Sequence, residues 1–180
     1  MIATRFATVF VLLAVSTMAS AASSDTTQTL IPPGLRITLQ RDTGGMEYRT
    51  FYIVTVTADG QVHFEGGAFV PTRRAHYRID AAKLEAIVAA IKQADFNDLR
   101  DSYDSPQDAC VTYMTDTPVM KITVADTKGS KSVRFTYGCL ATTPPTARPR
   151  IIQLGRTIDQ QLDVHRWLDA PAAPGTTGNP

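Results

Sequence analysis

The feature that most constrains the fold is an Asp-Gly dipeptide between two alternating segments. Residues 48–57 read as one strand and residues 61–65 as its return, with Asp59 and Gly60 between them. Asp-Gly suits the two-residue type I′ turn, whose twist matches that of the strands it joins. The dipeptide therefore predicts a β-hairpin near the start of the chain.

Other segments repeat the same alternation of apolar and polar residues. Apolar side chains at every second position bury one face of a strand and leave the other polar. A short extended piece is also expected at residues 110–114. The alternating segments predict further strands, the last two forming a second hairpin: residues 35–40, 75–79, 119–125 and 132–137.

Two segments change to the helical period. Behind Asp80, a preferred N-cap residue, the apolar residues Leu84, Ile87, Val88 and Ile91 lie at i, i+3, i+4 and i+7. A second helix is expected near the end of the chain, followed by a tryptophan that should fold back onto the core. Its apolar stripe and that tryptophan are Ile151, Leu154, Ile158, Leu162 and Trp167.

Hairpin strands combined with two separate helices indicate an α+β domain rather than a parallel α/β fold. We therefore expect a single antiparallel β-sheet of about six or seven strands, with both helices packed on one face. The apolar stripes of the helices and the apolar faces of the strands would form one core.

The first residues have the three parts of a secretory signal peptide. Arg5 precedes an apolar run over residues 6–18, and small residues end it at 19–21. The run is too short to span a bilayer, and this order is typical of a cleaved export signal. We expect a periplasmic or secreted protein with no integral membrane segment once the signal is removed.

Composition divides the rest of the chain. The expected organisation is a signal peptide (1–21), a flexible leader of small polar residues (22–32), one α+β domain (33–169) and a disordered tail (170–180). The chain has 18 basic and 17 acidic residues, and loss of Arg5 with the signal leaves 17 of each. This balance gives no electrostatic case for nucleic acid or anionic membranes as partners.

Cys110 and Cys139 are the two cysteines of the chain. Export would place them in an oxidising compartment, where a disulfide is stable. On the chain-entropy model a loop of about 30 residues gives about 3–4 kcal/mol. A reactive thiol is the alternative, but it needs a cation beside the thiolate, and neither residue belongs to a C-x-x-C pair. The pattern favours a Cys110–Cys139 disulfide.

Short motifs follow one another along the chain at residues 37–41, 52–60, 77–80, 96–99, 115–118, 137–139, 158–159 and 167–168, with Tyr103 and Cys110 between them. Their order resembles a family of bacterial envelope domains known only as a domain of unknown function. The resemblance extends over about residues 35–168. The family usually has a C-F-G-x-C-P segment between its first two strands, whereas residues 41–48 here contain no cysteine or proline. The resemblance implies fold and export, and no chemistry.

The polar faces of two strands hold the candidate ligand-binding residues. If Glu65 pairs opposite Arg74, His63 falls opposite His76, about 5 Å away. The two imidazoles would then offer a metal two ligands, with Glu65 as the one available third, whereas zinc needs three or four. We therefore assign no metal.

The same strand face has two other interpretations. Arg73, Arg74, His76 and Arg78 suit an anion, because the guanidinium fork bonds two oxygens at once. The simpler interpretation is a solvated polar face with a Glu65–Arg74 ion pair.

A loop with three aspartates, Asp101, Asp104 and Asp108, raises the question of calcium. Their spacing does not match an EF-hand, so turn and helix-end roles explain them more simply.

The sequence contains no G-x-S-x-G, H-E-x-x-H, P-loop or G-x-G-x-x-G motif. We assign no catalytic residue and no cofactor. The leading hypothesis is an exported, non-enzymatic binding module whose partner is an envelope protein, an anionic ligand or a cell-wall component. The alternatives are a periplasmic hydrolase with a site of scattered carboxylates or histidines, and a structural accessory subunit of an envelope complex.

Overall fold

The computed structural model describes residues 31–43 and 50–169. Its main element is a seven-stranded sheet with the strand order β4-β3-β2-β1-β7-β8-β5. A separate two-stranded sheet pairs β6 with β9. The strands are β1 (Arg36–Asp42), β2 (Phe51–Thr57), β3 (Gln61–Gly66), β4 (Arg74–Arg78), β5 (Ser102–Tyr103), β6 (Cys110–Tyr113), β7 (Val119–Asp126), β8 (Gly129–Thr136) and β9 (Cys139–Thr142).

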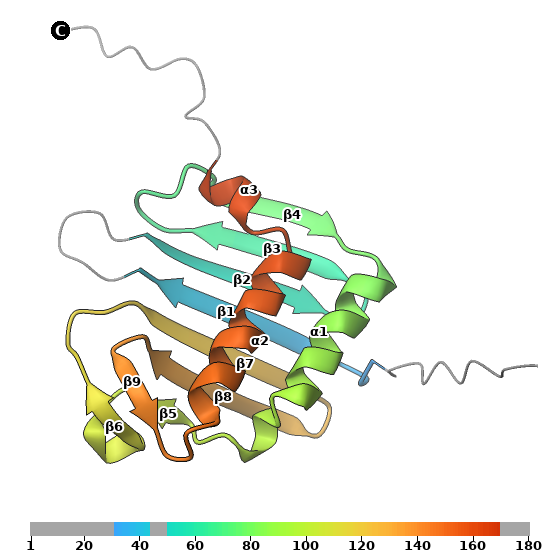
Figure 1. The fold of residues 1–180 in the computed structure, drawn as a ribbon. Coiled ribbons are helices and arrows are strands. Elements are labelled where there is room, and N and C mark those ends of the chain that lie inside the picture. Colours follow the sequence, from blue (N-terminus) through green and yellow to red (C-terminus); the bar gives the residue numbers. More distant parts are fainter. Residues whose placement is uncertain (1–30, 44–49, 170–180) are drawn as a thin grey trace, which may run out of the picture.

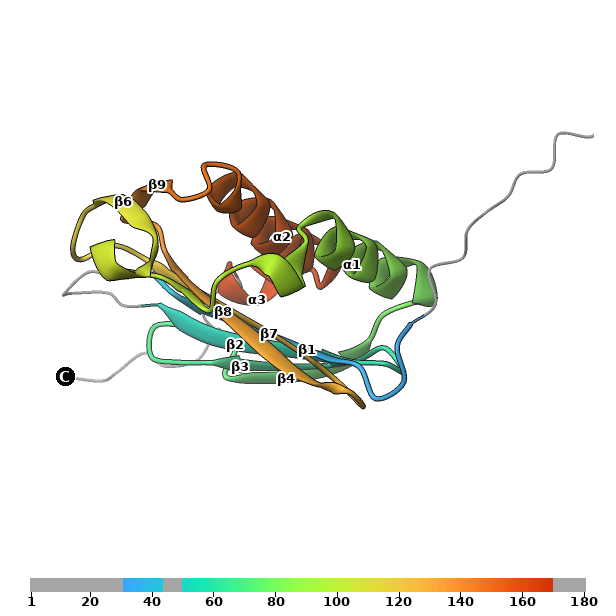
Figure 2. The ribbon, with the colours of Figure 1, turned by 90° about the horizontal axis from the view of Figure 1, so that it is seen from below.

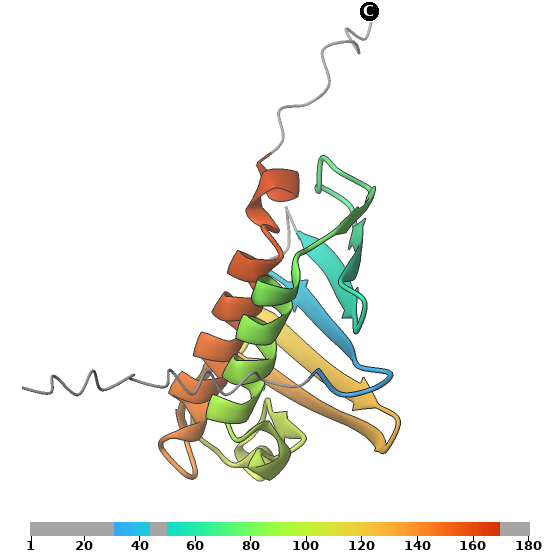
Figure 3. The same ribbon diagram turned by 90° about the vertical axis from the view of Figure 1, so that its right-hand side faces the viewer.

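The helices lie on one face of the large sheet, as Figures 1 and 2 show. The α-helices are α1 (Ala81–Gln93), α2 (Ala147–Gln161) and the short α3 (His165–Leu168). Two 3-10 turns are also present: η1 (Phe96–Asp98) joins α1 to β5, and η2 (Pro106–Asp108) joins β5 to β6. In Figure 3 the view from the side shows the helices on one side of the sheet and no helix on the other. The α+β class expected from the sequence is confirmed.

The hairpin between β2 and β3 forms as the Asp-Gly dipeptide predicts. Gly60 has a φ of +79°, which an L side chain rarely adopts. A Cβ atom there would also lie 2.7 Å from the carbonyl oxygen of Ile79. Glycine is therefore required both by the turn and by the close approach of the chain that enters α1.

Helix α1 begins where its N-cap residue predicts. The side chain of Asp80 accepts a hydrogen bond from the backbone nitrogen of Lys83 at 2.8 Å. Such a cap satisfies one of the free amides of the first turn. The apolar stripe behind it buries Leu84, Ile87 and Val88 against the sheet.

The core is one cluster between the sheet and the helices. Trp167, in α3, is 8% exposed and closes one end of it. Its ring stacks on Phe64 at 4.6 Å between centroids and meets the edge of Tyr77 at 5.1 Å. The sequence-based prediction that this tryptophan folds back onto the core is confirmed.

The predicted sheet of about six or seven strands is present, and it differs from a single antiparallel sheet in two respects. β5 pairs with β8 in parallel, within a segment that the sequence presents as a loop. β6 and β9 pair with each other and form the second sheet rather than joining the first. A strand of two residues such as β5 is too short to produce an alternating pattern, so periodicity alone cannot detect it.

The predicted disulfide is present. Cys110 of β6 and Cys139 of β9 are bonded, with 5.4 Å between their Cα atoms. Both residues are buried. The bridge therefore fastens the two strands of the small sheet to each other and joins segments 29 positions apart in the chain.

Several expectations fall outside the described residues. These are the signal peptide at 1–21, most of the leader at 22–32, the tail at 170–180 and much of the segment at 41–48 where the resembling family has its cysteines. Among the residues that the structure does describe, none of the helices has the length and apolar character needed to cross a membrane.

Candidate functional site

In the part of the chain that the structure describes, no helix covers the face of the seven-stranded sheet opposite α1 and α2 (Figure 3). We call it the outer face. It consists of the outward-pointing residues of β4, β3, β2, β1, β7 and β8. Because side chains alternate along a strand, the same strands send their apolar residues into the core and their polar residues to this face. All four candidate ligand-binding residues lie on it: His63, Arg74, His76 and Arg78.

The pairing of β3 with β4 follows the register expected from the sequence. Glu65 lies opposite Arg74, and His63 lies opposite His76. The two imidazoles face each other with 2.8 Å between their Nδ1 atoms and 4.6 Å between ring centroids. The two Nδ1 atoms are therefore within hydrogen-bond distance of each other, and the tautomers of the two rings decide which one donates.

The histidine pair begins a straight row of polar side chains across the sheet. Strand register places His76, His63, Thr55, Thr38, Thr123 and Ser132 side by side on six neighbouring strands. Hydroxyl pairs continue the row, with 3.0 Å between Thr38 and Thr55 and 2.8 Å between Thr123 and Ser132. We call this set the polar row. It runs across the strand direction.

Cationic side chains lie on both sides of the polar row. On one side, the register places Arg74, Lys121 and Arg134 two residues along their strands from the polar row. The same line contains one acidic residue, Glu65, opposite Arg74. On the other side lie Arg78 and Arg36. The outer face therefore has a polar centre with cations along both margins.

Few of these cations are neutralised by strong ion pairs. Arg78 lies 3.5 Å from Asp59, and both side chains are more than half exposed. Arg134 is bonded to Asp104. The Glu65–Arg74 ion pair expected from the sequence is not among the ion pairs of the described residues, although the two residues are opposite each other. Arg74 is therefore left as an exposed guanidinium.

The described residues offer too few ligands for the metal sites considered in the sequence analysis. Within residues 31–43 and 50–169, no three His, Cys, Asp or Glu side chains gather closely enough to hold a metal ion. His63 and His76 thus lack the third ligand that zinc requires.

The three aspartates considered for calcium have protein partners. Asp101 pairs with Lys131 at 2.9 Å, Asp104 with Arg134, and Asp108 accepts from Ser105 at 2.7 Å. Burial alone would raise the pKa of Asp104, but hydrogen bonds from Arg134 and Ser102 outweigh it and lower that pKa.

Sequence reasoning missed a charged cluster on the opposite, helix-covered face. Arg41 of β1 forms an ion pair with Asp159 of α2, with 2.6 Å between Nη2 and Oδ2. The same guanidinium donates to the hydroxyl of Tyr137. Tyr52 of β2 donates to the other oxygen of Asp159 at 2.8 Å. We call these four residues the Arg41 cluster.

Burial dominates the electrostatics of the Arg41 cluster. It raises the pKa of Asp159, and the Arg41 charge and the Tyr52 hydrogen bond counter this only in part. Burial and the nearby Asp159 charge also raise the pKa of Tyr52. For Arg41, burial disfavours the charge, yet attraction to Asp159 and Tyr137 prevails and raises its pKa. The arginine therefore stays charged and fastens α2 to the sheet.

A close approach of α2 to the sheet makes this contact possible. Gly155 of α2 is buried, and a Cβ atom there would lie 2.3 Å from the sulfur of Met120 and 3.0 Å from Nη2 of Arg41. The sequence does contain a signal for the cluster, because Arg41 continues the inward series Leu35, Ile37 and Leu39. A charge at an inward position predicts a buried partner, but not which one.

These features define a class: an α+β domain with helices on one sheet face, a bare polar face on the other and a disulfide-bonded small sheet. The chain belongs to the family described as Domain of unknown function (DUF6438), which matches residues 50–161. The match includes both cysteines and the candidate residues of β3 and β4. No curated protein matches the chain.

Proposed function

We propose that this protein is an exported, non-enzymatic binding module of the cell envelope that holds an acidic glycan on its outer face. The proposal depends on one observation: the polar row is bordered by exposed cations on both margins, on the sheet face that no helix covers. The disulfide is compatible with an oxidising compartment outside the cytosol.

The spacing of the strands suits an extended polymer. Neighbouring strands lie about 4.8 Å apart, so the polar row extends over roughly 24 Å across six strands. A linear chain lying along the row would place acidic groups within reach of Arg74 and Lys121 on one margin and of Arg78 and Arg36 on the other. The hydroxyl and imidazole groups beneath would meet its sugar hydroxyls.

Arginine suits this task better than lysine. Its planar fork bonds two oxygens of one carboxylate or phosphate, and its charge does not depend on pH. Arg36, Arg74 and Arg78 are exposed, so a ligand can reach these guanidinium groups without displacing a buried protein partner. Such contacts are weak one by one, and a polymer that meets several at once gains affinity from their number.

The strongly shifted ionisable groups support a binding role rather than catalysis. Enzymes gather groups with shifted pKa values at the site where substrate binds. Here Arg41, Tyr52 and Asp159 form such a group, but they lie between the sheet and α2 and bond to one another. These contacts stabilise the packing of α2 on the sheet. The outer face instead consists of polar side chains in rows across a sheet surface.

Binding to polygalacturonate tests the proposal, with neutral dextran as the uncharged polymer and polyphosphate to separate carboxylate from phosphate recognition. Replacing both Arg74 and Arg78 by alanine should weaken binding about tenfold, or about 1.4 kcal/mol. The matched control, Lys83→Ala with Arg156→Ala, removes the same charge from the helical side of the domain and should bind like the parent.

Equal binding by the parent and the Arg74→Ala, Arg78→Ala variant would remove the outer face from consideration. Shortening of the glycan during incubation, followed by the size of the products, would instead establish the hydrolase alternative. Equal affinities for dextran and polygalacturonate would contradict the proposal that the ligand is anionic.

A further inference from the structure

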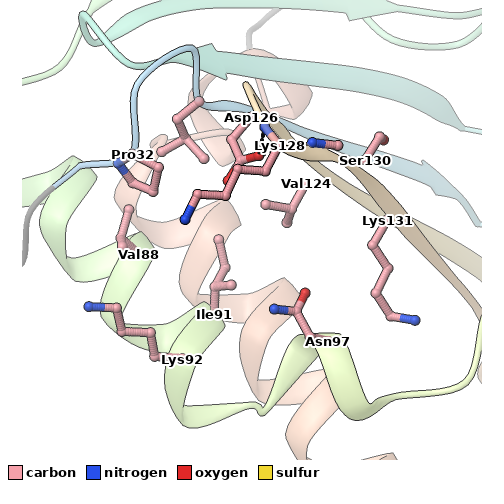
Figure 4. A pocket seen from close by; sticks show the side chains of 12 residues that line it. Pro32, Val88, Ile91, Lys92, Asn97, Val124, Asp126, Lys128, Ser130 and Lys131 are labelled. Carbon is pink, nitrogen blue, oxygen red and sulfur yellow. Dashed lines mark hydrogen bonds between the residues drawn. The ribbon is translucent and has the colours of Figure 1, made fainter.

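A concave region lies on the helix-covered side of the sheet, between α1 and the hairpin that joins β7 to β8 (Figure 4). Its volume is about 380 Å³, within the range of ligand pockets in proteins. None of the four candidate residues of the outer face lines it. Any ligand here would therefore be additional to the acidic glycan.

The floor of this pocket is apolar. Leu35 and Val88 are almost fully buried, at 3% and 4% exposed, and Ile91 and Val124 are partly buried. Ile91 is the last residue of the α1 apolar stripe. Figure 4 shows the side chains of Val88, Ile91 and Val124 facing the space between the helix and the strands. An apolar group of a ligand placed here would bury the surface that faces the floor, which is favourable.

The rim of the pocket is cationic. Lys92 reaches it from the last turn of α1, and Lys128 and Lys131 from the hairpin (Figure 4). Lys131 is paired with Asp101 at 2.9 Å. Lys92 and Lys128 belong to none of the ion pairs of the described residues. Two ammonium groups at this rim are therefore available to a ligand.

The one acidic residue of the lining, Asp126, forms no ion pair with these lysines. The Asp126 carboxylate accepts from the backbone nitrogens of Lys128 at 2.7 Å and Gly129 at 3.2 Å. These bonds hold the turn between β7 and β8. Asn97 adds an uncharged donor and acceptor at the rim. An apolar floor below an excess of ammonium groups is complementary to a molecule with an apolar body and an anionic head.

We propose that this pocket binds a medium-chain fatty carboxylate. The acyl chain would lie on Leu35, Val88 and Ile91, and the carboxylate would bond to Lys92 and Lys128. At about 30 Å³ for each heavy atom, the volume of a water in the liquid, the pocket holds roughly a dozen heavy atoms. Octanoate and decanoate have that size, so a longer acyl chain would extend into solvent.

Titration of the protein with octanoate, acetate and octan-1-ol tests the two halves of the pocket separately. Octanoate should bind more tightly than both, because acetate lacks the apolar body and the alcohol lacks the charge. Amide chemical shifts should change along the last turn of α1 and at residues 126–131. Shifts confined to other parts of the domain would overturn the assignment.

Variants sharpen the test. Lys92→Gln with Lys128→Gln should weaken octanoate binding at least fivefold and leave octan-1-ol binding unchanged, whereas the control Lys83→Gln with Arg156→Gln should leave both unchanged. Ile91→Ala should reduce the advantage of octanoate over butanoate. Equal octanoate affinity in the parent and in the Lys92→Gln, Lys128→Gln variant would disprove the proposed site. Polygalacturonate binding, measured on the same variants, should not change.

Discussion

Arg41 and Arg74 are arginines of one sheet with opposite surroundings. Arg41 points to the helices, has a side chain 15% exposed and is bonded to Asp159 and Tyr137. Arg74 points away from the helices, is exposed and belongs to no ion pair of the described residues. A buried charge that lacks a partner strongly lowers the free energy of unfolding. An exposed charge has little effect on stability and remains available to a ligand.

The largest effect should follow from breaking the inner pair. Asp159→Ala removes the counter-charge of Arg41 and leaves a guanidinium and the Tyr52 hydroxyl without their partner. Because both side chains keep some exposure, at 15% and 25%, we expect a loss of about 3 kcal/mol, at the lower end for buried pairs. Urea unfolding of the variant and the parent measures this loss.

An apolar replacement of both partners is the control for that experiment. Arg41→Met with Asp159→Leu should recover most of the stability that Asp159→Ala loses, because well-packed apolar side chains often replace a buried ion pair without loss. If Asp159→Ala is as stable as the parent, the Arg41 cluster does not hold α2 to the sheet.

Asp104 lies between the two extremes and should show a smaller, pH-dependent effect. Its carboxylate is bonded to Arg134, and its pKa is lowered on folding. The stabilisation is therefore present above the unfolded pKa, near 3.8, and is lost as the pH falls through the folded value.

Asp104→Asn should accordingly cost up to about 1 kcal/mol at pH 7 and make the acid side of the stability profile shallower. Thermal unfolding from about pH 2, roughly two units below the unfolded pKa, up to about pH 7 measures both changes. Asp98→Asn, at an exposed aspartate of η1, is the matched control. An acid profile as steep as that of the parent would contradict the role of Asp104.

The smallest effect on stability is expected on the outer face. Arg74→Ala with Arg78→Ala breaks only the long Arg78–Asp59 contact between exposed side chains. Exposed pairs contribute roughly 0–1 kcal/mol, so the unfolding free energy should change by less than about 0.5 kcal/mol. A loss close to that of Asp159→Ala would mean that these arginines support the fold and are not reserved for binding.

Local patterns predict much of this fold because they act over short distances. The Asp59-Gly60 turn sets the register of β2 on β3, and alternation then predicts which residues of β3 and β4 share a face. Alternation does not set the register of β4 on β3, so the pairing of His63 with His76 was predicted only on the condition that Glu65 lies opposite Arg74, as it does in the structure. Helix α1 was equally predictable, since its N-cap and apolar stripe lie within one segment.

The remaining features depend on contacts between distant segments. The Arg41 cluster joins distant residues, among them Tyr52 and Asp159, which are 107 positions apart, and nothing in either segment identifies the other. The parallel pairing of β5 involves two residues, and the pocket at Lys92 and Lys128 exists because α1 and the β7–β8 hairpin meet in space. Such features are set by the tertiary arrangement, which periodicity does not encode.

The two ends of the large sheet bear on how copies of this protein behave together. A free sheet edge can pair with the edge of a second copy and so begin a growing aggregate. Here one edge strand, β5, has two residues, and the other, β4, bears Arg74, His76 and Arg78. Two β4 edges that approached each other would bring like charges together. Repulsion between the arginines on β4 thus disfavours edge-to-edge pairing of two copies of the sheet.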